Sequence, residues 1–135
     1  MNSEQRIPDS GEVEYPAMRH EIRGVLEALS DLDYQETVWV GKNFPNTSYY
    51  DDFDMAIHTL YDDIGLGDDV HSQIGSTLRN ETEAWFVREV ISALEEVFAE
   101  AGLDSTFDVI RNSSGWPRVV NAAAAALAEF RKPLR

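Results

Sequence analysis

The segment that most constrains the fold is NETEAWFVREVISALEEVFAEAG, residues 80–102. Asn80 can cap a helix at this point, and Glu83 follows it at the spacing of a capping box. Gly102 is typical of a helix end. The apolar residues recur with the helical period and predict one continuous buried face: Val87, Val90, Ile91, Leu94, Val97, Phe98 and Ala101. A helix of this kind needs other elements to cover that face.

Three further segments show the helical period. The first covers about 16–30, and Pro16 suits its first turn. A short helix is expected near 105–111, and a longer one from Pro117 to about Phe130. The predicted inner faces of the first and last of these helices are Met18, Ile22, Val25, Leu26 and Leu29, and Val119, Val120, Ala123, Leu127 and Phe130.

Another helix is predicted over about 49–62. We expect Ser48 as its N-cap, and Asp51 and Asp52 in its first turn, where the helix dipole favours negative charge. Its predicted buried stripe consists of Phe53, Ile57, Leu60 and Ile64.

Two segments are ambiguous. Within residues 36–40, TVWV alone resembles a strand, whereas Ser30 or Asp31 can cap a short helix that ends near Gly41. We favour the helix, because no obvious partner strand exists elsewhere in the sequence. Residues 73–78 belong to a glycine-containing loop and are either extended or helical.

Together these segments predict an all-α protein, a single compact helical bundle of about four to six helices. The 135 residues suit one domain. Residues 1–14 are polar and include Pro8 and Gly11, so we expect a disordered tail there and a single helical domain over 15–135.

The composition excludes several classes of protein. There is no cysteine, and therefore no disulfide, thiolate zinc site or cysteine nucleophile. The N-terminus lacks the apolar run of a signal peptide, and no segment approaches the roughly 18 apolar residues of a membrane span. We expect a cytoplasmic protein without membrane contact. We expect no cofactor, because no phosphate-binding loop or dinucleotide fingerprint is present.

Acidic residues give the chain a net charge of −14 and are unevenly placed. Residues 1–106 hold 23 acids against 6 bases, a net −17, whereas residues 107–135 hold 2 acids against 5 bases, a net +3. Between Lys42 and Arg79 there are seven aspartates and no base. Such a field repels nucleic acid and anionic lipid and attracts basic surfaces.

Aromatic residues accompany these aspartates, a combination typical of protein-binding surfaces. The predicted partner-binding residues are Tyr49, Tyr50, Asp51, Asp52, Tyr61, Asp62, Asp63, Asp68 and Asp69. The aspartates would steer a basic protein partner, and the tyrosines would anchor it. The alternative places the aromatic rings in the core or at its edge, with Tyr49, Tyr50 and Trp85 as the candidates for exposure.

A second constellation suggests chemistry. Asp54, His58 and Asp62 are four residues apart and would stack on one face of a helix. Two carboxylates beside an imidazole can hold a divalent metal ion or act as acid and base, with His71 as a further candidate ligand. The alternative is an exposed histidine between two surface acids. The patterns of an EF-hand, an H-E-x-x-H helix and a G-x-S-x-G elbow are absent.

The segments PAMRHEIRGVLEALSDLDYQETVWV, FDMAIHTLYDD, IGSTLRNETEAW and WPRVVNAAAAALAEF resemble a family of small, acidic, bacterial proteins of unknown function, mainly actinobacterial. The resemblance covers about residues 15–131. It implies no activity, and it marks Asp54, His58, Asp62 and Asp63 as recurring polar positions.

The leading hypothesis is a non-catalytic acidic domain that masks a basic protein, as an immunity protein, an antitoxin or an inhibitor does. The alternative is a metal-binding or metal-dependent hydrolase domain that uses Asp54, His58 and Asp62. A third possibility is a structural subunit that associates through an exposed helix face. The charge argues against nucleic acid as the partner, and the oligomeric state stays open.

Overall fold

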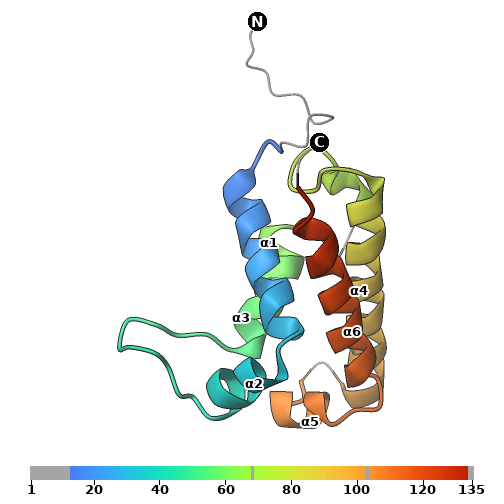
Figure 1. Ribbon diagram of the computed structural model, residues 1–135. Coiled ribbons are helices and arrows are strands. Elements are labelled where there is room, and N and C mark those ends of the chain that lie inside the picture. Colours follow the sequence, from blue (N-terminus) through green and yellow to red (C-terminus); the bar gives the residue numbers. More distant parts are fainter. Residues whose placement is uncertain (1–12, 68, 103, 134–135) are drawn as a thin grey trace, which may run out of the picture.

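The computed structural model describes residues 13–67, 69–102 and 104–133, and this part of the chain is all-α (Figure 1). Its elements are α1 (Pro16–Leu29), α2 (Leu32–Tyr34), the π-helical η2 (Gln35–Val40), α3 (Phe53–His58), the π-helical η3 (Thr59–Asp63), the 3-10 turn η4 (His71–Gln73), α4 (Glu81–Ala101), α5 (Phe107–Arg111) and α6 (Trp116–Phe130). The predicted all-α bundle is confirmed, with six α-helices in the described residues. Most of the predicted disordered tail, residues 1–14, lies outside them.

The three long helices form the body of the bundle (Figure 1). α6 packs against both α4 and α1, and α1 also contacts η3. α1 begins and α6 ends at the same end of the bundle, whereas α2 and α5 lie at the opposite end (Figure 1). None of the described helices combines the length and hydropathy that a membrane crossing requires.

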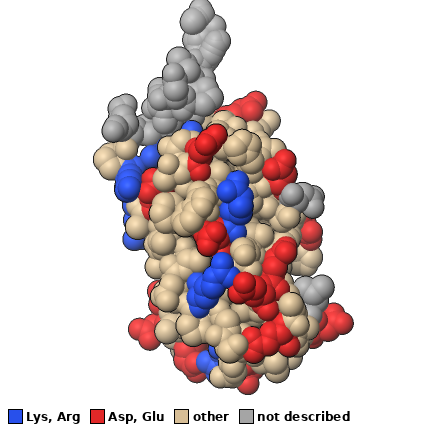
Figure 2. All heavy atoms as spheres, turned by 90° about the vertical axis from the view of Figure 1, so that its right-hand side faces the viewer, with Lys and Arg blue, Asp and Glu red and all other residues tan. Residues whose placement is uncertain are grey.

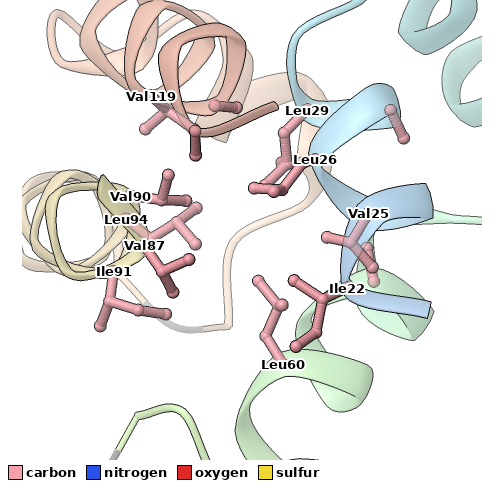
Figure 3. Close-up of a cluster of buried hydrophobic side chains, with 14 of the residues drawn as sticks. Ile22, Val25, Leu26, Leu29, Leu60, Val87, Val90, Ile91, Leu94 and Val119 are labelled. Atoms are coloured by element: carbon pink, nitrogen blue, oxygen red, sulfur yellow. The ribbon is translucent and has the colours of Figure 1, made fainter. Parts of the chain in front are cut away.

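The core lies where these helices face one another (Figure 3). Ile22 and Leu26 of α1 point toward Val87 and Leu94 of α4, and Leu60 of η3 lies beside them (Figure 3). None of these five side chains is more than 2% exposed. Burying a side chain of this size contributes about 1.5–3 kcal/mol relative to leaving it in water. The predicted apolar faces are therefore the surfaces that hold the bundle together.

Several predicted helix ends are correct. The side-chain oxygen of Asn80 accepts a hydrogen bond from the N–H of Glu83 at 2.9 Å, and Gly102 ends α4 with a φ of 97°. A positive φ of this kind is accessible to glycine at little cost. Pro16 and Pro117 stand in the first turns of α1 and α6, as expected.

The prediction for residues 49–62 was wrong at its start. α3 begins at Phe53, and its N-cap is Asp52 rather than Ser48. The Asp52 carboxylate accepts a hydrogen bond from the backbone N–H three residues later at 2.8 Å. Asp51 lies before the helix, because two aromatic donors from the preceding helical segment hold its carboxylate.

The two ambiguous segments have different structures. Residues 36–40 are helical, as favoured, and belong to a π-helical continuation of α2 whose C-cap is Gly41. This geometry buries Val38 and Trp39 on the inner side. Residues 73–78 contain the end of a 3-10 turn and then an isolated bridge between two of their own residues.

Glu83 is a buried acid, only 1% exposed, and it joins the long helices at one end. Its carboxylate accepts two hydrogen bonds from the Arg19 guanidinium at 2.7 Å each and one from the backbone N–H of Arg79 at 2.7 Å. Arg19 also donates to the Thr77 carbonyl at 3.0 Å and lies 4.3 Å from the centre of the Phe130 ring. The starts of α1 and α4 and the end of α6 thus meet at Arg19.

Gln35, 2% exposed, makes a similar connection at the other end of α1. Its side-chain amide donates to the carbonyls of Ala28 and Leu29 at 2.9 and 2.8 Å. Its side-chain oxygen accepts a hydrogen bond from the Trp116 indole N–H at 3.2 Å. These contacts supply donors to two terminal carbonyls of α1, of which that of Ala28 also accepts the Asp31 N–H at 3.3 Å. They also tie the end of α1 to the start of α6.

Replacing Arg19 tests the buried ion pair. Arg19→Met removes the two short hydrogen bonds to the buried Glu83 carboxylate and leaves it only the Arg79 guanidinium, 3.7 Å away, as a counter-charge, so we expect the free energy of unfolding to fall by about 3 kcal/mol. Urea denaturation followed by circular dichroism measures this change. Arg23→Met is the matched control, because Arg23 is exposed and lies 4.0 Å from Glu27. That control is expected to change stability by less than about 1 kcal/mol. Similar small losses in both variants would contradict the role of the pair.

Candidate functional site

The predicted partner-binding residues fall into two groups at the two ends of the α3–η3 helix. The first group, Tyr49, Tyr50, Asp51 and Asp52, precedes α3. The second group, Tyr61, Asp62, Asp63 and Asp69, lies in η3 and the following turn, while Asp68 is outside the described residues. About 15 Å of helix separates Asp52 from Asp62.

Asp51 is engaged within the fold. Its carboxylate accepts hydrogen bonds from the Trp39 indole N–H at 2.9 Å and from the Tyr34 hydroxyl at 2.6 Å. The Tyr34 hydroxyl also contacts the hydroxyl of Tyr49. Burial, and then the hydrogen bond to Asp51, raise the pKa of Tyr34. These contacts fix the loop before α3 against α2 and η2.

Tyr49 and Tyr50 are exposed, as predicted, at 37% and 53%. The Phe44 ring packs beside both, with centroid separations of 6.2 and 5.2 Å. The Tyr50 hydroxyl donates to the Asp52 carboxylate at 2.6 Å, and this hydrogen bond raises the pKa of Tyr50. The first group therefore presents two aromatic rings to solvent beside an acidic helix start.

The aspartates of the second group are exposed. The Asp62 carboxylate lies 2.5 Å from the Nδ1 atom of His58. Asp69 accepts a hydrogen bond from the Ser72 backbone N–H at 3.3 Å. Asp63 forms no ion pair with any described residue. This group is thus a solvent-exposed acidic surface.

Tyr61 differs from the other predicted anchors because it is half-buried. Its hydroxyl is buried and forms no hydrogen bond of good geometry with a described residue, although the Glu95 carboxylate is close enough to act on it. The ring lies so close to Gly67 that any Cβ at that position would clash with it. Burial, and then the charge of Glu95, raise the pKa of Tyr61. Tyr61 therefore supports the turn that follows η3.

The metal-binding hypothesis is based on Asp54, His58 and Asp62, all of which are exposed. His58 and Asp62 meet, whereas Asp54 makes no hydrogen bond with either of them. In the part of the chain that the structure describes, no three acidic or histidine side chains are arranged to hold a metal ion. The metal site stays a prediction, and no contact places a third ligand beside His58.

A groove that was not foreseen from the sequence runs along α1. This α1 groove has a volume of about 940 Å³, and its lining comes from α1, α2, α3, α6 and the loop before α3. Gly24 lies on its surface, where an added Cβ would meet nothing within 4 Å. Leu32 and Met55 line it and are 60% and 45% exposed. The sequence signal was Gly24 itself, since glycine inside a helix needs a reason.

The fold and these surfaces define a small all-α domain with exposed acidic and aromatic groups. A family model described as a domain of unknown function (DUF7945) matches residues 13–133, so the chain belongs to this family. The predicted membership of a family of unknown function is confirmed. No match was found among the curated proteins or the solved structures.

Removing the Tyr61 hydroxyl is expected to stabilise the protein. Tyr61→Phe deletes a buried polar group that has no hydrogen bond, so the free energy of unfolding should rise by about 1 kcal/mol. Tyr34→Phe is the matched control, because it deletes a hydroxyl bonded to Asp51 and should lower that free energy by about 1 kcal/mol. Urea denaturation of both variants measures the two values. A loss of stability in Tyr61→Phe would show that the hydroxyl donates a hydrogen bond to the Glu95 carboxylate.

Gly24→Ala tests whether the fold requires glycine in α1. The substitution is expected to raise the free energy of unfolding by about 0.5–1 kcal/mol, because alanine favours the helix and its Cβ meets only open space. Gly41→Ala is the control, since its Cβ would lie 2.9 Å from the Thr37 carbonyl oxygen and should destabilise. Thermal and urea unfolding measure both. Destabilisation by Gly24→Ala would reveal a structural constraint at this position.

Proposed function

We propose that this protein is a non-catalytic acidic domain of a bacterial cytoplasm that binds a basic protein and masks its cationic surface. An immunity protein, an antitoxin or an inhibitor of a basic enzyme is the concrete form. The observation that supports the proposal is the unequal neutralisation of charge over the surface. Acids outnumber bases, and the bases are not distributed evenly among them.

On α4, α5 and α6 the bases neutralise neighbouring acids. Arg118 contacts Glu89 and Glu96 at 3.4 and 2.7 Å, and Arg111 and Arg131 each lie within 3.4 Å of an acid. Figure 2 shows the side of the bundle that lies on the right in Figure 1, where basic groups stand among the acidic ones. The net field of this region is therefore reduced by its own ion pairs.

The α3–η3 segment has no comparable neutralisation. No lysine or arginine of the described chain pairs with Asp54, Asp62, Asp63 or Asp69, and His58 is the one basic group in contact with them. An exposed cluster of uncompensated acids raises the local concentration of a cationic partner and accelerates association. It also repels the phosphates of nucleic acid.

The aromatic residues near this charge supply a source of affinity that steering alone does not. Tyr50 and Tyr49 expose their rings at the start of α3, and Phe44 packs beside them. Tyrosine is enriched among the residues that dominate binding energy at protein interfaces. We therefore assign attraction to the aspartates and contact to the tyrosines.

Charge reversal tests the proposal against a captured partner. The full chain is immobilised, a lysate of the native host is applied at low salt, and a single basic protein is expected to elute late in a salt gradient. With that protein, Asp62→Lys together with Asp63→Lys should weaken binding about tenfold or more and reduce its dependence on salt. Surface plasmon resonance over a range of ionic strength measures both quantities.

The matched control reverses the same amount of charge where acids are already paired with bases, through Glu89→Lys together with Glu129→Lys. It is expected to alter binding less than the first variant does, because these two acids lie outside the α3–η3 segment and their charges are already offset by Arg118 and Lys132. Affinity that survives reversal of Asp62 and Asp63 would contradict the proposed surface. An eluate without a basic protein would contradict the proposed function.

A further inference from the structure

We propose that the α1 groove is the binding site for a basic amphipathic helix of the partner protein. The inference rests on the proposed function and deepens it, because it names the surface that gives the contact its shape and the kind of segment that fills it. Three independent features of the groove support it: its floor, its apolar lining and the charge along its rim.

The floor of the groove is made of small residues. Gly24 and Ala28 are four residues apart in α1 and therefore share a face of the helix. Gly24 has an ordinary helical φ, and an added Cβ there would meet only open space, so neither backbone nor packing requires glycine. Small residues at a helix contact reduce the separation at which a second helix can pack. The position is thus open to another chain rather than filled by this one.

The lining contains apolar side chains that the bundle leaves uncovered. Leu32 of α2 is 60% exposed and Met55 of α3 is 45% exposed, and the ring of Tyr49 completes this side. An amphipathic helix laid in a groove places its residues at i, i+3, i+4 and i+7 against such side chains. Methionine adapts its shape to different apolar partners.

The charged residues that line the groove favour a positively charged ligand. Glu21, Asp31 and Asp33 lie along the groove, and Glu21 and Asp33 form no ion pair with any described residue. The base in the lining is Arg131, which already lies 3.4 Å from Glu27. Lysine and arginine side chains on an incoming helix would find these carboxylates along the α1 and α2 side of the groove.

This charge also argues against two other occupants. The first twelve residues of the chain contain three acids and one base, and a second copy of the protein carries a net charge of −14. Both would bring negative charge to a negative rim. A basic helix from a different protein is the occupant whose charge is complementary.

A synthetic peptide tests the proposed helix-binding site directly. The peptide is a helix of about five turns, roughly 18 residues, with leucine at i, i+3, i+4 and i+7 spacing and lysine on its flanks, and its control is a scrambled peptide of the same composition. By fluorescence anisotropy, the full chain should bind the amphipathic peptide about tenfold more tightly than the scrambled one, because both carry the same charge.

Gly24→Leu fills the floor without changing any charge, and leucine is a strong helix former, so circular dichroism should show an intact fold. This variant is expected to bind the two peptides equally. Ala125→Leu is the matched control, because Ala125 is an exposed α6 residue outside the groove and should keep the preference.

The outcomes separate this inference from the proposed function. If the Gly24→Leu chain keeps its preference for the amphipathic peptide, the groove is not the helix-binding site. The proposed function still stands in that case if reversal of Asp62 and Asp63 abolishes binding to the captured partner. Equal binding of both peptides by the wild-type chain would also contradict a helix-binding site in the groove. A wild-type dimer that Gly24→Leu converts to a monomer in light scattering would show that a second copy occupies the groove instead.

Discussion

The buried contact between Glu83 and Arg19 is the constraint on which the arrangement of the bundle depends. A carboxylate removed from water costs several kcal/mol unless a cation and other donors reach it. Apolar burial is non-directional and permits more than one register of α1 against α4, whereas a two-pronged guanidinium contact is satisfied in one geometry. Because the Arg19 guanidinium also covers the Phe130 ring, the same contact positions the end of α6. One side chain therefore relates three helices that are distant in sequence.

The open groove follows from this anchoring. Arg19 holds the start of α1, and the Gln35 amide holds its last carbonyls and the start of α6. Because both ends of α1 are fixed and its inner face is buried, the face of α1 that contains Gly24 points away from the core. Residues of α2 and α3 line the groove beside this face. The same polar contacts that stabilise the bundle thus determine which face of α1 is left for another molecule.

The parts of the fold that were predictable are those encoded locally. A one-sided apolar face and a capping residue can be recognised within a single stretch of sequence. For this reason the ends of α1, α4 and α6 were predicted nearly to the residue. The start of α3 was not predictable, because Asp51 binds Trp39 and Tyr34, which are 12 and 17 residues away. The Glu83 capping pattern was equally local, but its contact with Arg19 spans 64 residues. For the site, the sequence identified the acidic and aromatic residues but not which of them the fold itself uses.

Some aspartates form hydrogen bonds within the fold and others face the solvent. The solvent-facing aspartates explain how a basic partner is attracted but not how one partner is distinguished from another. Asp51 and Asp52 serve the loop and the helix start, whereas Asp63 and its neighbours are left to the solvent. A field from free acids accelerates the approach of any cationic protein and does not discriminate among them. Discrimination requires a surface that only one shape can fill without leaving polar groups unpaired. In the arrangement proposed for this protein, the α3–η3 aspartates draw the partner in, and the small floor at Gly24 decides whether it fits.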